Sequence, residues 1–110
     1  MSGATLKTVL EDVADNLFNP DPYYQQGGDM VRVGGLSFRL NIDAPAGQRI
    51  ENLSLWPQGE LLEASREYTV AGWGSVNPDV EGPPVWDVVE AYLADHREVA
   101  FTPNRAVTLT

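Results

Sequence analysis

Cysteine is absent from the 110-residue chain, and histidine occurs only once, at position 96. Without cysteine there can be no disulfide, no thiol nucleophile and no thiolate metal site. The sequence also lacks an Asp-x-Asp-x-Asp calcium loop, an HExxH motif and a GxGxxG motif. His96 falls near the end of a predicted helix, where a lone imidazole more often complements the helix dipole than catalyses. The residues of this chain therefore predict no catalytic set.

Basic residues are scarce as well. Seven Lys and Arg stand against sixteen Asp and Glu, which gives a formal net charge of -9. Nucleic acids and anionic membranes bind basic surfaces, so this balance argues against both as partners. No apolar run approaches the ~20 residues that a membrane-spanning helix needs, and no signal peptide is visible. A freely diffusing anion would be repelled, so an anionic substrate needs either local positive charge or a carrier that delivers it.

The pattern of apolar residues predicts one α+β domain over residues 1–110, with a mixed or antiparallel sheet packed with two main helices. Apolar side chains recur at helical spacing in residues 4–18, and the following Asn-Pro-Asp-Pro ends that helix. Pro83-Pro84 suits the first turn of a second helix, whose apolar stripe, including Trp86, we expect to be buried. Strands are predicted at residues 29–33, 36–42, 49–56, 68–71 and 99–101, with a tight turn at 57–60.

The acidic residues of the two helices are expected to face solvent. Glu11, Asp12 and Asp15 belong to the first helix, and Asp87 and Glu90 to the second. Charged residues on a helix most often form its solvated face, opposite the apolar stripe. We therefore assign them no chemical role.

An arginine inside the predicted strand 29–33 is the first candidate for binding. Side chains alternate along a strand, so if Val31 and Val33 enter the core, Met30 and Arg32 line the opposite surface beside Gly27-Gly28. A guanidinium is a planar cation with five donors, which suits an oxyanion such as sulfate, sulfonate or phosphate. The alternative is an arginine paired with a carboxylate on a solvated sheet face. The carboxylates in question are Asp29 and Glu51, and the residues alone leave both interpretations open.

A second candidate is the glycine- and aromatic-rich loop that begins at Gly72. Trp73 lies between two glycines, where backbone can approach a ligand closely, and Asn77 offers hydrogen bonds in the same loop. The alternative is that Trp73 caps the edge of the sheet.

Four segments, in this order, resemble the C-terminal domain of the SoxB family, sulfur-oxidation hydrolases of the 5′-nucleotidase superfamily. The resemblance covers nearly the whole chain, and the first segment is specific to SoxB among nucleotidase relatives. The segments are LKTVLEDVADNLFNPDPYYQQGGDMVRVGG, GQRI, YTVAGWGSVN and GPPVWDVVEAYL.

This resemblance implies half of a two-domain periplasmic enzyme. The other half, an N-terminal metallophosphoesterase domain, would hold two manganese ions, whereas this chain would bind no metal and would be inactive alone. The expected reaction is release of sulfate from a cysteine S-sulfonate on the mobile arm of the carrier SoxYZ. The expected partners are thus that N-terminal domain and the SoxYZ arm.

The resemblance also assigns roles to residues. Nucleotidases offer the nucleoside an aromatic and a polar side chain where this chain has Met30 and Arg32, and a second stacking aromatic falls at Trp73. Their GGDG loop is replaced by NPDVEGPP, which weakens the case for nucleotide binding. Arg32 would engage the sulfonate or the arm's carboxy terminus, while Tyr23, Tyr24 and Asp29 would line the channel for the arm. Two alternatives stay open, a non-catalytic protein-docking module and a nucleotide-binding C-domain.

Overall fold

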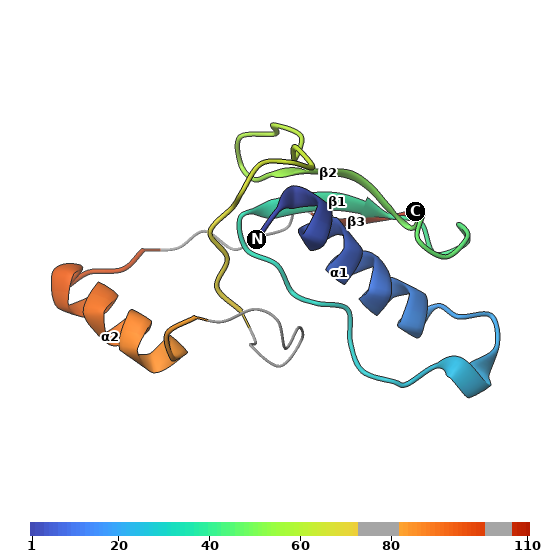
Figure 1. Ribbon diagram of the computed structural model, residues 1–110, viewed down its shortest axis with the longest axis horizontal. Helices are drawn as coiled ribbons and strands as arrows, with labels where there is room; N and C mark the ends of the chain where they lie inside the picture. Colours follow the sequence, from blue (N-terminus) through green and yellow to red (C-terminus); the bar gives the residue numbers. More distant parts are fainter. Residues whose placement is uncertain (73–81, 101–106) are drawn as a thin grey trace. The chain divides into compact units, whose positions relative to one another are not determined.

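The computed structural model describes residues 1–72, 82–100 and 107–110, which belong to two units (Figure 1). The first unit comprises Met1–Tyr68 with Asn104–Thr110, and the second comprises Thr69–Pro103. The helices and the mixed sheet confirm the predicted α+β class. The elements are α1 (Gly3–Leu17), the 3-10 helix η1 (Pro22–Tyr24), β1 (Leu36–Leu40), β2 (Ile50–Leu55) and β3 (Val107–Leu109) in the first unit, and α2 (Val85–Asp95) in the second.

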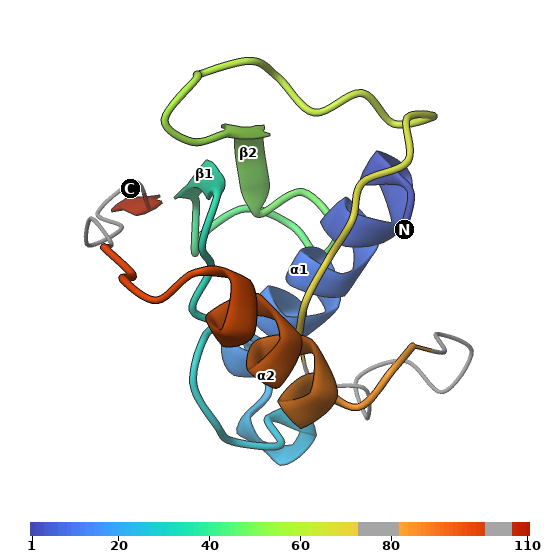
Figure 2. The ribbon, with the colours of Figure 1, turned by 90° about the vertical axis from the view of Figure 1, so that its left-hand side faces the viewer.

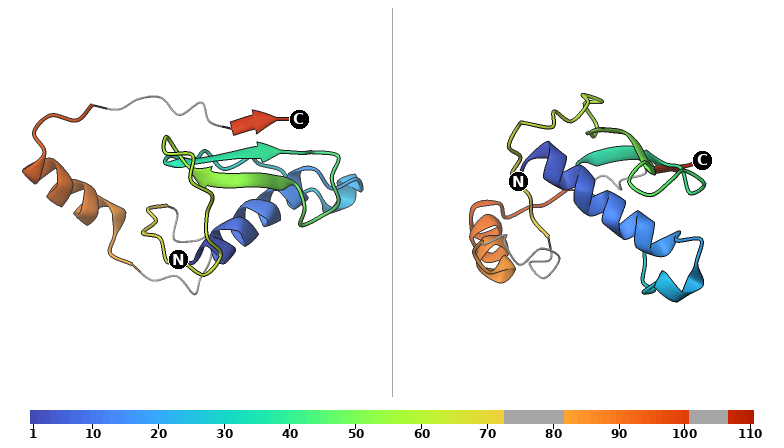
Figure 3. Two further views of the ribbon diagram at one scale, coloured as in Figure 1. Left: turned by 90° about the horizontal axis from the view of Figure 1, so that it is seen from above. Right: turned by 45° about the vertical axis from the view of Figure 1, so that its right-hand side comes forward.

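The sheet has the strand order β2-β1-β3. β1 pairs with β2 in antiparallel fashion and with β3 in parallel fashion, as the strand directions in Figure 3 show. The strands at 36–42 and 49–56 and the turn at residues 57–60 were predicted, and the Leu55 amide closes that turn by donating to the Glu60 carbonyl oxygen at 2.7 Å. β3 was not predicted, because three residues in a weakly patterned tail carry too little periodicity to indicate a strand.

The core of the first unit lies between α1 and one face of the sheet (Figures 1 and 2). Alternation along β1 places Phe38 and Leu40 in this core, at 3% and 5% exposure, while Arg39 faces away. The predicted inward face of β1 is therefore confirmed. The buried cluster consists of Leu10, Ala14, Phe38, Leu40, Ile50 and Leu53.

The start of α1 is fixed against residues 63–68. Ser2 is the N-cap, and its Oγ accepts from the Thr5 amide at 3.1 Å. Gly3 approaches the Glu63 carbonyl so closely that a Cβ would overlap it. Tyr68 donates its amide to Met1 O at 2.9 Å. Because this segment bonds to the N-terminus, the predicted strand at 68–71 is wrong, and the antiparallel pairing here is a single bridge between Ser2 and Glu67.

Three further sequence predictions are wrong in the described residues. Residues 29–33 form no strand, and Met30 and Val33 pack on the core at a spacing of three while Val31 is 38% exposed. Both edges of β1 are already taken by β2 and β3, so this segment has no place beside β1.

The apolar stripe of α2 and Trp86 (69%) are exposed, because the described part of the second unit contains no other helix or strand. Residues 99–100 form no strand, and residue 101 lies outside the described ranges.

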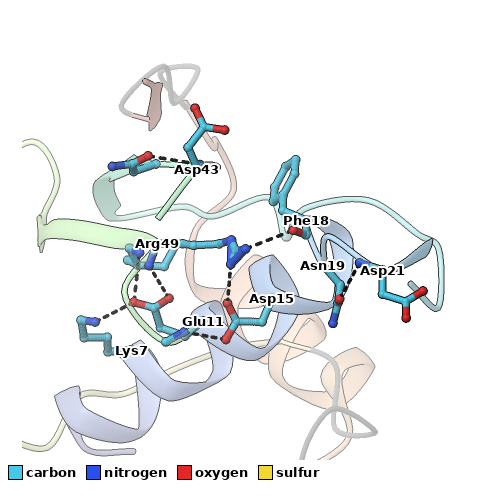
Figure 4. A network of polar contacts seen from close by, with 11 residues as sticks. Lys7, Glu11, Asp15, Phe18, Asn19, Asp21, Asp43 and Arg49 are labelled. Atoms are coloured by element: carbon cyan, nitrogen blue, oxygen red, sulfur yellow. Dashed lines mark hydrogen bonds and ion pairs between the residues drawn. The ribbon is translucent and has the colours of Figure 1, made fainter. Parts of the chain in front are cut away.

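A buried carboxylate joins α1 to the start of β2, which corrects the expectation that Glu11 and Asp15 face solvent (Figure 4). Glu11 is 5% exposed, and its two oxygens accept from the amides of Arg49 at 2.9 Å and Ile50 at 3.0 Å. Lys7 Nζ donates to the same carboxylate at 2.7 Å. We call this set, with Asp15, the helix–strand clamp.

Arg49 completes the helix–strand clamp. Its side chain is 6% exposed, and the guanidinium donates to Asp15 Oδ1 at 3.0 Å and to the Phe18 carbonyl oxygen at 3.0 Å. Asp15 Oδ2 in turn accepts from the Gly47 amide at 2.8 Å. Among the side chains that the structure describes, only the Nε of Arg49 is buried without a partner. The clamp therefore fixes the last turns of α1 onto the segment Gly47–Ile50, which is the GQRI of the sequence.

We expect Glu11→Gln to lower the free energy of unfolding by about 2–4 kcal/mol, because the amide nitrogen of glutamine would face a backbone donor and one buried N–H would lose its acceptor. Urea denaturation measures this change. Asp12→Asn is the control, since Asp12 is exposed on the same helix and should leave stability nearly unchanged. Equal stabilities for the two variants would show that the clamp does not hold the fold.

Candidate functional site

The loop that follows α1 carries most of the predicted binding residues. It leaves the C-terminal end of α1, turns through η1 and returns along α1 to β1 (Figure 1). Arg49 holds its first end through the Phe18 carbonyl, and the Trp56 amide holds its last end by donating to the Gly35 carbonyl oxygen at 2.9 Å. We call residues 19–34 the recognition loop.

Side chains from α1 and the loop itself hold its first half. Asn16 Oδ1 accepts from the Gln26 amide at 2.6 Å, and Asn16 Nδ2 donates to the Gly27 carbonyl oxygen at 3.4 Å. Gln25 Nε2 donates to the Asn19 carbonyl oxygen at 2.7 Å, and Asp21 caps η1 by accepting from the Tyr23 amide at 2.9 Å. These bonds give an otherwise irregular segment one defined path.

Tyr23 and Tyr24 form an exposed aromatic pair at the tip of the recognition loop. Their ring centroids lie 5.3 Å apart in a T-shaped arrangement, and the residues are 87% and 62% exposed. Large aromatic side chains at the surface with an apolar body and a polar tip are typical of interaction surfaces. Both residues are thus accessible to a partner, as their predicted role requires.

Arg32 is exposed, and so is Asp29. In the described part of the chain Arg32 has no ion pair, so the alternative of a pair with Asp29 or Glu51 is not formed. Met30 does not share its surface, because Met30 is half-buried against the core. The prediction that Met30 and Arg32 line one outward face is therefore wrong for Met30, whose role in substrate contact stays untested.

Gly27 and Gly28 have φ values of +79° and +97°. A Cβ at either position would meet no atom within 4 Å. Glycine is favoured here because of backbone conformation rather than close approach of another group. This agrees with a loop that must reverse direction beside α1.

The structure does not bring all predicted residues together. Trp73 and Asn77 lie outside the described residues, so their convergence with Arg32 stays a prediction. No hydrogen bond, ion pair or ring contact among the described residues joins the tyrosine pair to Arg32. His96 is the C-cap of α2, where its Nδ1 lies 3.0 Å from the Tyr92 carbonyl oxygen and its ring stacks on Tyr92 at 4.1 Å.

The described ranges 1–72, 82–100 and 107–110 contain neither a cluster of metal ligands nor a membrane-spanning helix. These ranges contain no group of three or more His, Cys, Asp or Glu residues placed to hold a metal ion. Nor does any helix in them have the length and apolar character needed to cross a membrane.

Comparison with known proteins defines the class. The family model of the 5′-nucleotidase C-terminal domain matches residues 1–82, and the chain therefore belongs to the 5′-nucleotidase C-terminal domain family. Among solved structures it is similar to the sulfate thiohydrolase SoxB of Thermus thermophilus, in complex with glycerol, with 37% identity and a TM-score of 0.73. The match covers 99% of this chain and 21% of that chain. No curated protein matches the chain.

We expect Asn16→Ala to loosen the recognition loop without unfolding α1, because it removes both side-chain bonds from the helix to Gln26 and Gly27. The Gln26 amide should exchange with solvent at least about tenfold faster, as expected for a bonded amide that becomes open. Amide hydrogen exchange followed by NMR measures this rate. The amide of the buried Leu10 on the same helix is the internal control, and unchanged exchange at Gln26 would contradict the assigned anchor.

Proposed function

We propose that this chain is the substrate-recognition domain of a SoxB-type hydrolase that releases sulfate from cysteine S-sulfonate groups on the SoxYZ carrier. The observation that carries the proposal is the 37% identity to SoxB over 99% of this chain. Since the chain spans only 21% of that protein, the reaction itself belongs to the whole enzyme. The family model alone supports only a nucleotidase-type C-domain.

The burial of Met30 and the exposure of Arg32 support a substrate other than a nucleotide. A nucleobase needs an exposed aromatic platform, whereas Met30 is unbranched, aliphatic and turned onto the core. Arg32 is exposed and has no ion pair among the described residues, so its five donors are available to an oxyanion. A sulfonate offers three oxygens for charge-assisted hydrogen bonds of this kind. Arg32 is accordingly the residue that we assign to the sulfonate or to the arm's terminal carboxylate.

The proposed metal chemistry lies outside this chain. The described residues do not fit a dinuclear metal site, because no suitable cluster of ligands exists among them. Two manganese ions in an N-terminal metallophosphoesterase domain are therefore part of the proposal for the whole enzyme, and we derive no step through them. A periplasmic location is proposed on the same ground. This chain's task would be to bind and orient the substrate arm.

A second candidate function is a protein-docking module without a role in the substrate pocket. The tyrosine pair favours it, because 87% and 62% exposure are unusual for two adjacent aromatic residues that serve only folding. The two functions differ in whether Arg32 matters for turnover. They also differ in whether the sulfonate group is needed for binding.

The chain alone should release no sulfate from an S-sulfonated carrier peptide, with or without added manganese. The reason is that no ligand set for the metal pair is expected in it. Ion chromatography of sulfate measures the result. Turnover above the rate of the peptide in buffer would contradict the placement of the metals in another domain.

Arg32→Ala in the full-length protein should lower kcat/KM at least about tenfold, because a charge-assisted contact to the substrate is lost. Its free energy of unfolding should change by less than about 0.5 kcal/mol, as for a surface residue without partners. Arg66→Ala is the matched control, since Arg66 is an exposed arginine that pairs with Glu60 and Glu63 at 3.3 and 3.5 Å. Equal turnover for the two variants would contradict the role of Arg32 in substrate binding. Unfolding of Arg32→Ala would show that Arg32 has a structural role instead.

A further inference from the structure

The sheet face opposite α1 contains a polar hollow that the proposed function does not use. Its volume is about 270 Å³, and all of its lining residues belong to the first unit. The strand registers explain why polar side chains gather there. Ser37 lies opposite Ser54, and Arg39 lies between Glu51 on β2 and Thr108 on β3. The lining residues are Ser37, Phe38, Arg39, Asn52, Ser54 and Thr108.

Arg39 is the charged group of this hollow. It is exposed, and its side chain makes no hydrogen bond or ion pair in the described part of the chain. Glu51 lies directly across the strand pair, yet the two side chains are not within ion-pair distance. In the described part of the first unit, the other exposed arginine apart from Arg32 is Arg66, and it has two carboxylate partners. Arg39 thus has donors that the described fold does not use.

Residues with hydroxyl groups line the hollow beside Arg39. The Oγ atoms of Ser37 and Ser54 lie 2.7 Å apart, and one of them donates to the other. Thr108 brings a third hydroxyl from the neighbouring strand. Hydroxyl groups and a guanidinium are donors that complement a small oxyanion.

The backbone beside the hollow is in a conformation that is unusual for a residue other than glycine. Asn52 has φ +53°, in the left-handed region, and it lies where the β1–β2 register shifts between Ser37 and Arg39. Such conformations cluster at binding and catalytic sites. The shift leaves Asn52 opposite no single residue of β1, and Asn52 lines the hollow instead.

We propose that this hollow binds a small tetrahedral oxyanion, such as sulfate or phosphate, with Arg39 as the main anchor. The lining favours an anion, because its one charged side chain is an arginine and most of the others offer hydroxyl or amide donors. Glu51 limits the affinity, because it competes for the guanidinium and repels the anion at short range. The proposal does not depend on the proposed function, because Arg39 lies on β1 and Arg32 on the recognition loop.

Titration of the isotope-labelled chain with sodium sulfate, and separately with sodium phosphate, tests the proposal. Sodium chloride keeps the ionic strength constant, because exposed charges respond to salt alone. In NMR spectra we expect saturable shifts at Ser37, Asn52, Ser54 and Thr108. Sulfate and phosphate report on the same site, and their relative affinities show which oxyanion it prefers.

Three variants assign the binding to residues. Arg39→Gln should raise the dissociation constant at least about tenfold, because a charge-assisted contact is lost. Arg66→Gln is the matched control and should leave it unchanged, because Arg66 is an exposed arginine that already pairs with Glu60 and Glu63. Asn52→Gly relieves the left-handed conformation and removes the carboxamide, so it should preserve the fold while weakening binding.

Each outcome decides the question. Saturable shifts that disappear in Arg39→Gln and persist in Arg66→Gln support the site. Shifts that stay linear in the wild-type chain, or that survive Arg39→Gln, overturn it. Shifts that disappear in Arg66→Gln as well would overturn it too, because they would report a loss of positive charge rather than a contact at Arg39. If Arg39→Gln fails to fold, the wild-type titration together with Asn52→Gly still decides whether the anion binds in the hollow.

Discussion

The buried carboxylate of Glu11 is the interaction on which the first unit depends. Two consecutive amides at the start of β2 donate to it. One side chain thus accepts the hydrogen bonds that a neighbouring strand would otherwise accept. Leaving a buried N–H without its acceptor costs about 1–3 kcal/mol, and more for a charged group, whereas a surface ion pair contributes at most about 1 kcal/mol. Arg49 extends this interaction to Asp15 and Phe18. Through Phe18 the helix–strand clamp also determines where the recognition loop begins.

The amphipathic helix and the alternating strand could be predicted because each carries its own period in the sequence. The burial of Glu11 could not be predicted, because its partners are backbone amides of a segment 38 residues away. Backbone donors do not show in the pattern of side chains. Lys7, Glu11 and Asp15 recur every four residues, which fits a solvated helix edge equally well. GQRI stood out only through the family resemblance, and the helix–strand clamp now gives it a physical reason.

For the recognition loop, too, the sequence predicted some positions correctly and others wrongly. The family resemblance assigned its tyrosines and residue type assigned its arginine, and the structure places all three at the surface. The position of Met30 was wrong because a strand period of two was assumed, whereas the chain packs Met30 and Val33 three residues apart. Trp73 and Asn77 lie outside the described residues and stay predictions. Arg39 escaped notice because its neighbours Ser37, Ser54 and Thr108 come together only through strand pairing.

The acidic chain and its few exposed arginines fit the proposed role, in which an anion would be held by local positive charge rather than drawn in by long-range attraction. A net charge of -9 repels free anions, which suits a substrate that a carrier protein delivers. The most direct test is an NMR titration of the labelled chain with one carrier-arm peptide in two forms, S-sulfonated and unmodified. The account predicts shift changes at residues 22–35 and 72–80 that are clearly stronger for the sulfonated form. Identical changes for both forms, or changes confined to the helices, would contradict it.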